Sequence, residues 1–157
     1  MSIAPKLQQF LDEAKADYEL VEHAPTKSSL ETAKSCDVPA DRIAKSVLLD
    51  TDDGQLLAVL PSDRKVELSE LRSELGRKPR LASEDEIRNV FVDCELGAVP
   101  PIGYGVTTIV DDSLGKQPDV YFEAGDHKSL VHMNWAEFSR VTQGIRHGQF
   151  SEPSLVD

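Results

Sequence analysis

Apolar residues near the beginning of the chain recur every three to four positions over residues 3–16. This spacing predicts a helix with one buried face. The short run of residues 18–23 then favours a strand. Because a serine hydroxyl can accept a hydrogen bond from the backbone at the start of a helix, we expect Ser28 or Ser29 to cap a second helix that ends near Cys36.

A β-hairpin is the clearest signal in the first half of the chain. Two β-rich apolar runs, 45–50 and 55–60, are separated by residues 51–54, which end in Asp-Gly. An Asp-Gly pair between such runs is typical of a tight hairpin turn. After the hairpin, the pattern of residues 66–75 predicts a helix, and Gly76 is expected to end it.

The second half of the chain alternates between helix and strand signals. Ser83 begins a capping-box sequence, Ser-Glu-Asp-Glu, which predicts a short helix to about Val90. Asn134 is expected to cap a final helix, and the chain from Gly144 onward is expected to be irregular. The other expected elements are strands over residues 106–110, 119–124 and 129–133, with a turn at 125–128 between the last two, and the final helix over 135–143.

The order of these elements indicates the fold class. Strands and helices are interspersed, and several strands are linked by hairpins, which favours an α/β fold with a mixed sheet over a fully parallel sheet. A chain of 157 residues has the size of one domain with a single substantial core. We expect this domain to span residues 1–143 and an irregular tail to span residues 144–157.

Composition limits the cellular setting. No stretch approaches the ~20 apolar residues of a membrane span, and the first residues lead directly into a helix pattern without a signal peptide. We therefore expect a cytoplasmic protein that does not bind a membrane. Cys36 and Cys94 are interpreted as reduced structural thiols, although Cys94 lies close enough to Gly97 in the sequence to reach a pocket there.

The formal net charge is −11, from 17 basic and 28 acidic residues. Broad binding to a nucleic-acid backbone requires clustered lysine and arginine, so this charge argues against a DNA-binding protein. Residues 61–80 are the one clearly basic stretch. Two interpretations remain open for it: a local contact with an RNA end, or a helix face with i,i+4 charge pairs.

Two segments carry most of the candidate chemistry. The loop from Gly97 to Gly103 contains Pro100 and Pro101, which restrict φ, and its glycines permit close approach of a ligand. Backbone N–H groups held in this way can stabilise negative charge on a carbonyl oxygen. Lys45, at the beginning of an apolar run, can donate to a phosphate or carbonyl oxygen. Taken singly, a rigid surface loop and a lysine at a strand edge explain the same patterns.

The expected turn at residues 125–128 displays Asp126 and His127, and His127 could act as a proton shuttle or bind a hydroxyl group. Asp126, His127 and His132 also suggest a metal site, but an offset of five positions places the two histidines on opposite faces of a strand. His23 and His147 are interpreted as ordinary surface histidines.

No nucleophile motif is present. The chain lacks Gly-x-Ser-x-Gly, a phosphate-binding P-loop and the dinucleotide-binding glycine pattern. Ser46 directly follows Lys45, so a strand would point the two side chains to opposite faces, which argues against a Ser–Lys dyad.

Together, four segments resemble the YbaK-like aminoacyl-tRNA deacylase family, which includes trans-editing proteins and the editing insertion domain of bacterial prolyl-tRNA synthetase. The segments are Arg42–Leu49 (RIAKSVLL), Leu57–Pro61 (LAVLP), Gly97–Gly103 (GAVPPIG) and Val120–His127 (VYFEAGDH). The resemblance covers the chain from about residue 7 to residue 138. It implies a compact α/β fold with a mixed, partly barrel-like sheet and flanking helices.

The resemblance also implies an activity, which is hydrolysis of the ester that joins a wrongly attached amino acid to the tRNA 3′ end. A small amino acid such as alanine or cysteine on tRNA for proline is the expected substrate, and an aminoacyl-tRNA synthetase is a further implied partner. The family's lysine corresponds to Lys45, which would anchor the terminal phosphate, and the family's loop glycine corresponds to Gly97. Members of the family lack a protein nucleophile, and the substrate 2′-hydroxyl is thought to assist the attack. The expected substrate-binding residues are Ala98, Val99, Pro100, Pro101, Gly103, Asp126 and His127.

Two alternatives remain beside this hydrolase. A non-catalytic module would hold an aminoacyl, nucleotide or carboxyl ligand in the same pocket. A metal-dependent hydrolase would use Asp126, His127 and His132 and would lose activity with a chelator. Neither a cofactor nor a metal ion is expected for the leading interpretation.

Overall fold

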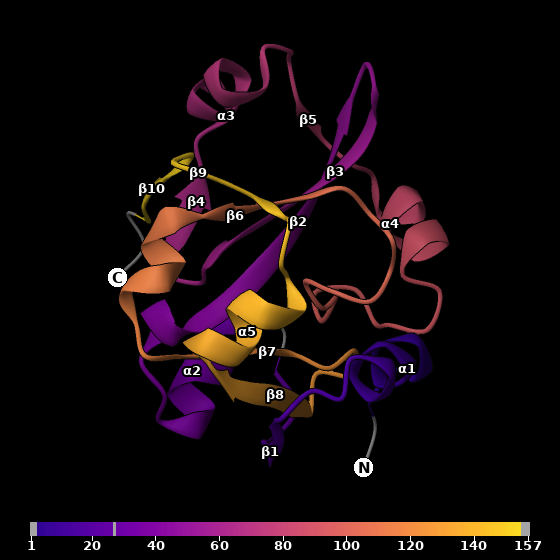
Figure 1. The fold of residues 1–157 in the computed structure, drawn as a ribbon, viewed down its shortest axis with the longest axis vertical. Helices are drawn as coiled ribbons and strands as arrows, with labels where there is room; N and C mark the ends of the chain where they lie inside the picture. The colour runs from indigo at the N-terminus through magenta and orange to yellow at the C-terminus, as the bar shows by residue number, and fades with distance from the viewer. Residues whose placement is uncertain (1–2, 27, 155–157) are drawn as a thin grey trace.

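The computed structural model describes residues 3–26 and 28–154 (Figure 1). The helices are α1 (Pro5–Glu13), α2 (Ser29–Cys36), α3 (Leu68–Leu75), α4 (Glu84–Val90) and α5 (Trp135–Val141), with short 3-10 helices η1 (Ala40–Arg42) and η2 (Asp112–Lys116). The strands are β1 (Glu19–Glu22), β2 (Ile43–Thr51), β3 (Gly54–Pro61), β4 (Arg64–Val66), β5 (Arg80–Leu81), β6 (Thr108–Asp111), β7 (Asp119–Glu123), β8 (Ser129–Asn134), β9 (Arg146–Gly148) and β10 (Ser151–Pro153).

The main sheet has the strand order β1-β8-β7-β2-β3-β6-β9, and β5 pairs with β2 beside this path. β4 and β10 form a separate two-stranded sheet. The pairs β2–β7, β3–β6 and β6–β9 are parallel, whereas β2–β3, β7–β8 and β1–β8 are antiparallel. The predicted mixed α/β sheet with hairpins is therefore confirmed. Figure 1 shows the β2–β3 hairpin extending away from the body of the protein toward α3 and β5.

Alternate residues of the sheet pack against different helices. On one face, residues such as Leu48, Leu57 and Phe122 form the largest core cluster with Leu7 of α1 and Phe138 of α5. On the other face, Ile43 and Leu130 pack against Ala33 of α2, and a third cluster includes Leu60, Leu71 of α3 and Phe150. The sheet thus separates a face covered by α1 and α5 from a face covered by α2 and α3.

The predicted helix caps are present. Ser28 accepts a hydrogen bond from the backbone N–H of Glu31, and Asn134 accepts one from Glu137 at 2.8 Å. Ser83 and Glu86 form the complete capping box. Gly76 ends α3 with φ of +73°, a left-handed conformation that favours glycine.

The C-terminal segment differs from the expectation of an irregular tail. Residues 146–148 form β9 at the edge of the main sheet, and residues 151–153 form β10. Phe150 between them is fully buried, and its backbone N–H donates to Asp111 Oδ1 at 3.0 Å. The expectation of an irregular segment is therefore wrong for residues 146–153, because long-range pairing rather than local pattern orders them, and residues 155–157 lie outside the described residues.

Candidate active site

The loop after α4 has glycines at both ends, as the sequence indicates. Gly97 has φ of +82° and Gly103 has φ of +100°, so both adopt the left-handed backbone that favours glycine. Pro100 and Pro101 are buried, whereas Gly97 is exposed. The Ala98 N–H closes a turn by donating to the Glu95 carbonyl at 3.1 Å. The prolines therefore anchor the loop while its glycine-bearing turn faces outward.

Two backbone donors of this turn have no protein acceptor. Among residues 3–26 and 28–154, no hydrogen bond uses the N–H group of Gly97 or of Val99. Unpaired backbone N–H groups need water or a ligand as an acceptor. This arrangement gives the loop the chemical property expected of a site that binds a carbonyl oxygen or an oxyanion.

The turn between β7 and β8 is attached directly to this loop. The Glu95 N–H donates to the Gly125 carbonyl at 2.8 Å, and the ring Nε2 of His127 forms a hydrogen bond with the Leu96 carbonyl. His127 has φ of +60°, a left-handed conformation that is uncommon outside glycine. His127 therefore lies at the turn, as predicted, but its ring contacts the loop.

Asp126 has a structural contact and an unused oxygen. Its Oδ1 accepts hydrogen bonds from the N–H groups of Lys128 at 2.9 Å and Ser129 at 3.0 Å, which fixes the turn. Its Oδ2 is buried and has no hydrogen-bond partner among the described residues. Oδ1 therefore fixes the backbone of the turn, and Oδ2 can still accept a hydrogen bond.

Helix α1 holds both segments from one side. The backbone N–H of Ala4 donates to the Ala124 carbonyl at 2.9 Å, and the N–H of Lys6 donates to Asp93 Oδ2 at 2.8 Å. A Cβ placed on Gly125 would lie 2.8 Å from Ala4 Cβ. The start of α1 thus packs closely against the turn and against the beginning of the loop.

Lys45 lies on β2, opposite Leu60 of β3. The parallel pairing of β2 with β7 matches Ile43 with Tyr121 and Ala44 with Phe122, so the next residues in register are Lys45 and Glu123. The side chain is half-buried, and this burial lowers the pKa of Lys45, while the Asp63 carboxylate opposes the shift. Among the described residues no hydrogen bond or ion pair uses its ammonium group. Lys45 is therefore a partly desolvated cation beside the strand end that leads into the Gly125–His127 turn.

The Ser–Lys dyad is excluded by geometry, as expected. Ser46 occupies the β2 position between Ala44 and Leu48, which face the cluster with α1, whereas Lys45 points to the opposite face. The Ser46 hydroxyl is buried and has no hydrogen-bond partner in the described part of the chain.

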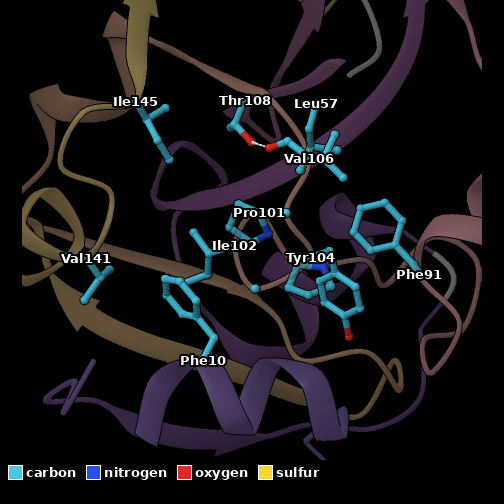
Figure 2. Close-up of a pocket in the computed structure, with 13 residues that line it drawn as sticks. Phe10, Leu57, Phe91, Pro101, Ile102, Tyr104, Val106, Thr108, Val141 and Ile145 are labelled. Atoms are coloured by element: carbon cyan, nitrogen blue, oxygen red, sulfur yellow. Dashed lines mark hydrogen bonds between the residues drawn. The ribbon is translucent and has the colours of Figure 1, made fainter. Parts of the chain in front are cut away.

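A cavity of about 170 Å³ lies behind the loop (Figure 2). Its lining is mostly apolar and includes Pro101 and Ile102 from the loop and Phe10 from α1. Leu57, another lining residue, lies on the sheet face opposite to Lys45. This cavity is therefore separate from Lys45. Pro101 and Ile102 of the loop line the cavity, whereas Gly97 of the same loop is exposed to solvent.

One group of buried polar side chains was missed in the sequence. The sequence predicts a surface position for His23, but its side chain is only 1% exposed and its Nε2 lies 3.3 Å from Glu123 Oε1. Burial, and next the charge of Asp126, raise the pKa of Glu123 to about 8, although the Thr32 hydroxyl opposes them. His23 and Glu123 are 100 positions apart, so only the β1–β8–β7 pairing brings them together. His147, in contrast, is exposed as expected.

The metal hypothesis finds no support in the geometry. His132 forms hydrogen bonds with Glu19 and Asp119, whereas His127 is bonded to the loop. Within residues 3–26 and 28–154, no three side chains of histidine, cysteine, aspartate or glutamate are grouped so that they could hold a metal ion.

Both cysteines are free thiols in this structure. Burial raises the pKa of Cys94 to about 12, with the Tyr104 hydroxyl opposing and the Asp93 carboxylate reinforcing the shift. Such a thiol is not a nucleophile near neutral pH. Cys94 instead packs against the Gly125 turn, where a Cβ on Gly125 would lie 3.3 Å from its Sγ.

The basic stretch of residues 61–80 is paired over long range. Lys65 lies 3.2 Å from Glu152, Arg77 forms an ion pair with Asp53, and Arg64 donates to Ser151. These contacts connect separate elements and are not the i,i+4 pairs expected on one helix face. None of the helices in the described residues is long and apolar enough to span a membrane.

Comparison with known proteins places these features in a family. A family model described as an aminoacyl-tRNA editing domain matches residues 23–141. The chain is 28% identical over 142 residues to the prolyl-tRNA editing protein ProX of Acetoanaerobium sticklandii, covering 85% of this chain and 86% of that protein. It is 29% identical over 126 residues to the proline–tRNA ligase of Halalkalibacterium halodurans, covering 78% of this chain and 22% of the ligase.

A solved structure shares the fold. A crystal structure described as that of a candidate trans-editing enzyme for prolyl tRNA synthetase superimposes with a TM-score of 0.85 at 22% identity. The match covers 96% of this chain and 99% of that one, so the shared fold extends over nearly the whole chain.

Proposed function

Since this chain belongs to the family of aminoacyl-tRNA editing domains, we propose that it hydrolyses the ester between an amino acid and the tRNA 3′ end. The observation that carries this proposal is the pair of N–H groups on Gly97 and Val99 that have no acceptor among the described residues. Their loop is hydrogen-bonded to the turn that follows β7, and β7 pairs with β2, the strand that carries Lys45. A loop with free donors next to a free cation suits a negatively charged transition state.

Each group has a role in the proposed reaction. The ammonium of Lys45 binds the 3′-terminal phosphate, which is the nearest fixed negative charge of the substrate. The N–H groups of Gly97 and Val99 donate to the ester carbonyl oxygen as it becomes an oxyanion. Ala98, Pro100, Pro101 and Gly103 set the conformation of this loop, and His127 holds it through the Leu96 carbonyl.

Water is the proposed nucleophile. It attacks the ester carbonyl to give a tetrahedral intermediate, which collapses with release of the 3′-oxygen. The neighbouring 2′-hydroxyl of the substrate can pass a proton from the attacking water to that oxygen. This assignment agrees with the raised pKa of Cys94 and with the isolation of Ser46 from Lys45, which leave both as poor nucleophiles.

For the substrate, we propose tRNA for proline that carries a small wrong amino acid, such as alanine or cysteine. The names of the similar proteins support this choice, since both refer to prolyl-tRNA editing or to proline–tRNA ligase. A synthetase that produces such a mischarged tRNA is the proposed functional partner.

The test is release of labelled amino acid from a panel of mischarged tRNAs, including alanyl- and cysteinyl-tRNA for proline. We expect multiple turnover by the wild type and a loss of about 100-fold for Lys45→Ala. Lys116→Ala removes an exposed lysine on η2 and serves as the matched control. Binding of the panel without turnover would instead establish a non-catalytic module, and full activity of Lys45→Ala would remove this lysine from the mechanism.

A further inference from the structure

A cluster of buried polar atoms lies at the end of β7 and has no assigned use in the proposed reaction. The side chains of His23 and Glu123 are 1% and 4% exposed, and Nε2 of the first lies 3.3 Å from Oε1 of the second. Asp126 is three residues beyond Glu123, and its charge acts on the Glu123 carboxyl. Two buried titratable side chains therefore face each other in the interior, and Asp126 follows them in the adjoining turn.

The hydrogen-bonding capacity of this cluster is largely unused. Within the described residues, both carboxyl oxygens of Glu123, Oδ2 of Asp126 and Nε2 of His23 are buried without a hydrogen bond. Buried polar atoms in folded proteins are nearly always satisfied, because an unsatisfied one is costly. Three carboxyl oxygens at the end of β7, of which Oε1 of Glu123 faces the His23 ring, therefore have the capacity to accept hydrogen bonds from a cationic ligand.

The cluster lies on the same side of the sheet as Lys45. Ile43 of β2 pairs with Tyr121 of β7, and both side chains pack in the cluster with Ala33 of α2. Two residues farther along the two strands, Glu123 and Lys45 occupy matching positions. The Gly97 loop is attached to the same turn through Gly125. The Glu123 carboxyl therefore lies on the same sheet face as Lys45, and Asp126 lies in the turn to which the loop is attached.

The ligand chemistry follows from the number and charge of the acceptors. A primary ammonium group has three N–H donors and one positive charge, which matches three unused carboxyl oxygens. A metal ion fits less well, since the described residues contain no group of side chains that could hold one. An aminoacyl ester carries such an ammonium group on the carbon next to the reacting carbonyl.

We propose that Glu123 and Asp126 bind the α-ammonium group of the aminoacyl ester, and that His23 covers this subsite when it is empty. The inference rests on the proposed function and adds a specificity rule to it. A primary ammonium can use all three acceptors, whereas the prolyl group has only two N–H donors and a ring on its nitrogen. The subsite therefore favours alanyl or cysteinyl esters over the correct prolyl ester.

Opening the subsite requires movement of one side chain. His23 follows β1, and its backbone N–H donates to the Lys128 carbonyl at 2.8 Å, which can persist when the ring turns outward. The next residues, Ala24 and Pro25, are exposed, and turning the ring outward breaks the hydrogen bond between its Nδ1 and the Ala24 carbonyl. The positive charge of the ligand also favours the ionised form of Glu123, which burial disfavours.

The experiment uses the full chain and two stable ligands, 3′-alanylamino-3′-deoxyadenosine and its N-acetyl derivative. The acetyl group removes the positive charge and two donors but keeps the alanine side chain and the nucleoside. We expect the wild type to bind the free amine at least tenfold more tightly in an NMR titration, with the His23 ring signal shifting only for the free amine. Glu123→Gln should reduce this preference to less than twofold, while Glu22→Gln, an exposed neighbour on β1, should keep it.

The possible failures are distinguishable. Equal binding of both ligands by the wild type, or an unchanged preference in Glu123→Gln, overturns the ammonium subsite and leaves the hydrolase intact. If neither ligand binds, the proposed function fails and the subsite with it. Asp126→Asn provides a second variant if Glu123→Gln does not fold, because Oδ1 still accepts the two turn hydrogen bonds. We expect it to weaken binding of the free amine alone, and equal weakening of both ligands contradicts the subsite.

Discussion

The imidazole of His127 and the backbone carbonyl of Leu96 are joined by a hydrogen bond across 31 residues of sequence. This bond connects the β7–β8 turn with the glycine–proline loop, next to the unused N–H groups of Gly97 and Val99. The His127 ring therefore contacts the loop backbone, so a positioning effect on catalysis can be tested separately from proton transfer.

His127→Ala should lower the single-turnover deacylation rate by about tenfold, because the loop loses one of its two attachments to the turn. Hydrogen exchange of the amides in residues 96–99 should become faster in the same variant. His147→Ala, which changes an exposed histidine, is the control. A slow reaction with unchanged amide exchange would contradict the positioning role and favour direct participation of the ring.

The pH dependence of the reaction should report the charge of Lys45. Because burial lowers the pKa of this ammonium, with Asp63 in opposition, it loses its proton at a lower pH than an ordinary lysine does. The wild-type rate should therefore fall with rising pH in the alkaline range. Lys45→Arg keeps its charge throughout and should show no such fall, even if its rate is lower.

Rates between pH 7.5 and 9.5, corrected for spontaneous ester hydrolysis, check this prediction. Parallel profiles for the wild type and Lys45→Arg would show that the titration belongs to another group.

Gly125→Ala should destabilise the protein through a specific collision. The added Cβ would lie 2.8 Å from Ala4 Cβ, and the backbone φ of +108° is also unfavourable for alanine. We expect a loss of about 3 kcal/mol in the free energy of unfolding, against about 1 kcal/mol for Gly144→Ala, where φ is +88° and no atom lies within 4 Å.

Urea denaturation of the two variants measures the difference. Adding Ala4→Gly to Gly125→Ala removes the other half of the collision and should recover part of the loss. No recovery in the double variant would place the cause in backbone strain alone.

Glu123 should make stability depend on pH. Its folded-state pKa is raised from 4.5 to about 8, first by burial and next by Asp126, so the folded state holds this proton more tightly than the unfolded state. The stabilising contribution is fully present below pH 4.5 and declines as the pH rises through about 8. Glu123→Gln, which cannot ionise, should therefore be more stable than the wild type by about 2 kcal/mol at pH 9 and nearly equal to it at pH 4.5.

Thermal or urea unfolding at several pH values tests this expectation, with Glu22→Gln as the control at an exposed position. A constant difference between the wild type and Glu123→Gln across this range would show that the carboxyl group titrates normally.

Local signals in the sequence were sufficient where the structure is itself local. The turn ending at Gly54, the caps at Ser28, Ser83 and Asn134, and the end of α3 at Gly76 each depend on bonds within a few residues. Strands β4, β5, β9 and β10 are two or three residues long and are held by distant partners, so no periodic pattern marks them.

The candidate site shows the same division. Lys45 and the Gly97–Gly103 loop were found through a family resemblance carried by short motifs, and the opposite orientation of Ser46 follows from strand alternation. The burial of His23 beside Glu123 depends on the order of three strands. Neither residue has neighbours in sequence that signal this contact, so composition and spacing could not reveal it.

The hydrogen bonds from the start of α1 to the β7–β8 turn and to the segment before the Gly97–Gly103 loop determine how far this domain can be truncated. The family match begins at residue 23, yet Ala4 and Lys6 bond to Ala124 and Asp93. A protein trimmed to the matched region would keep the chemistry-bearing residues and lose the brace that holds the turn and the loop together. The segment that the family model matches is therefore shorter than the segment expected to fold with the loop and the turn in place.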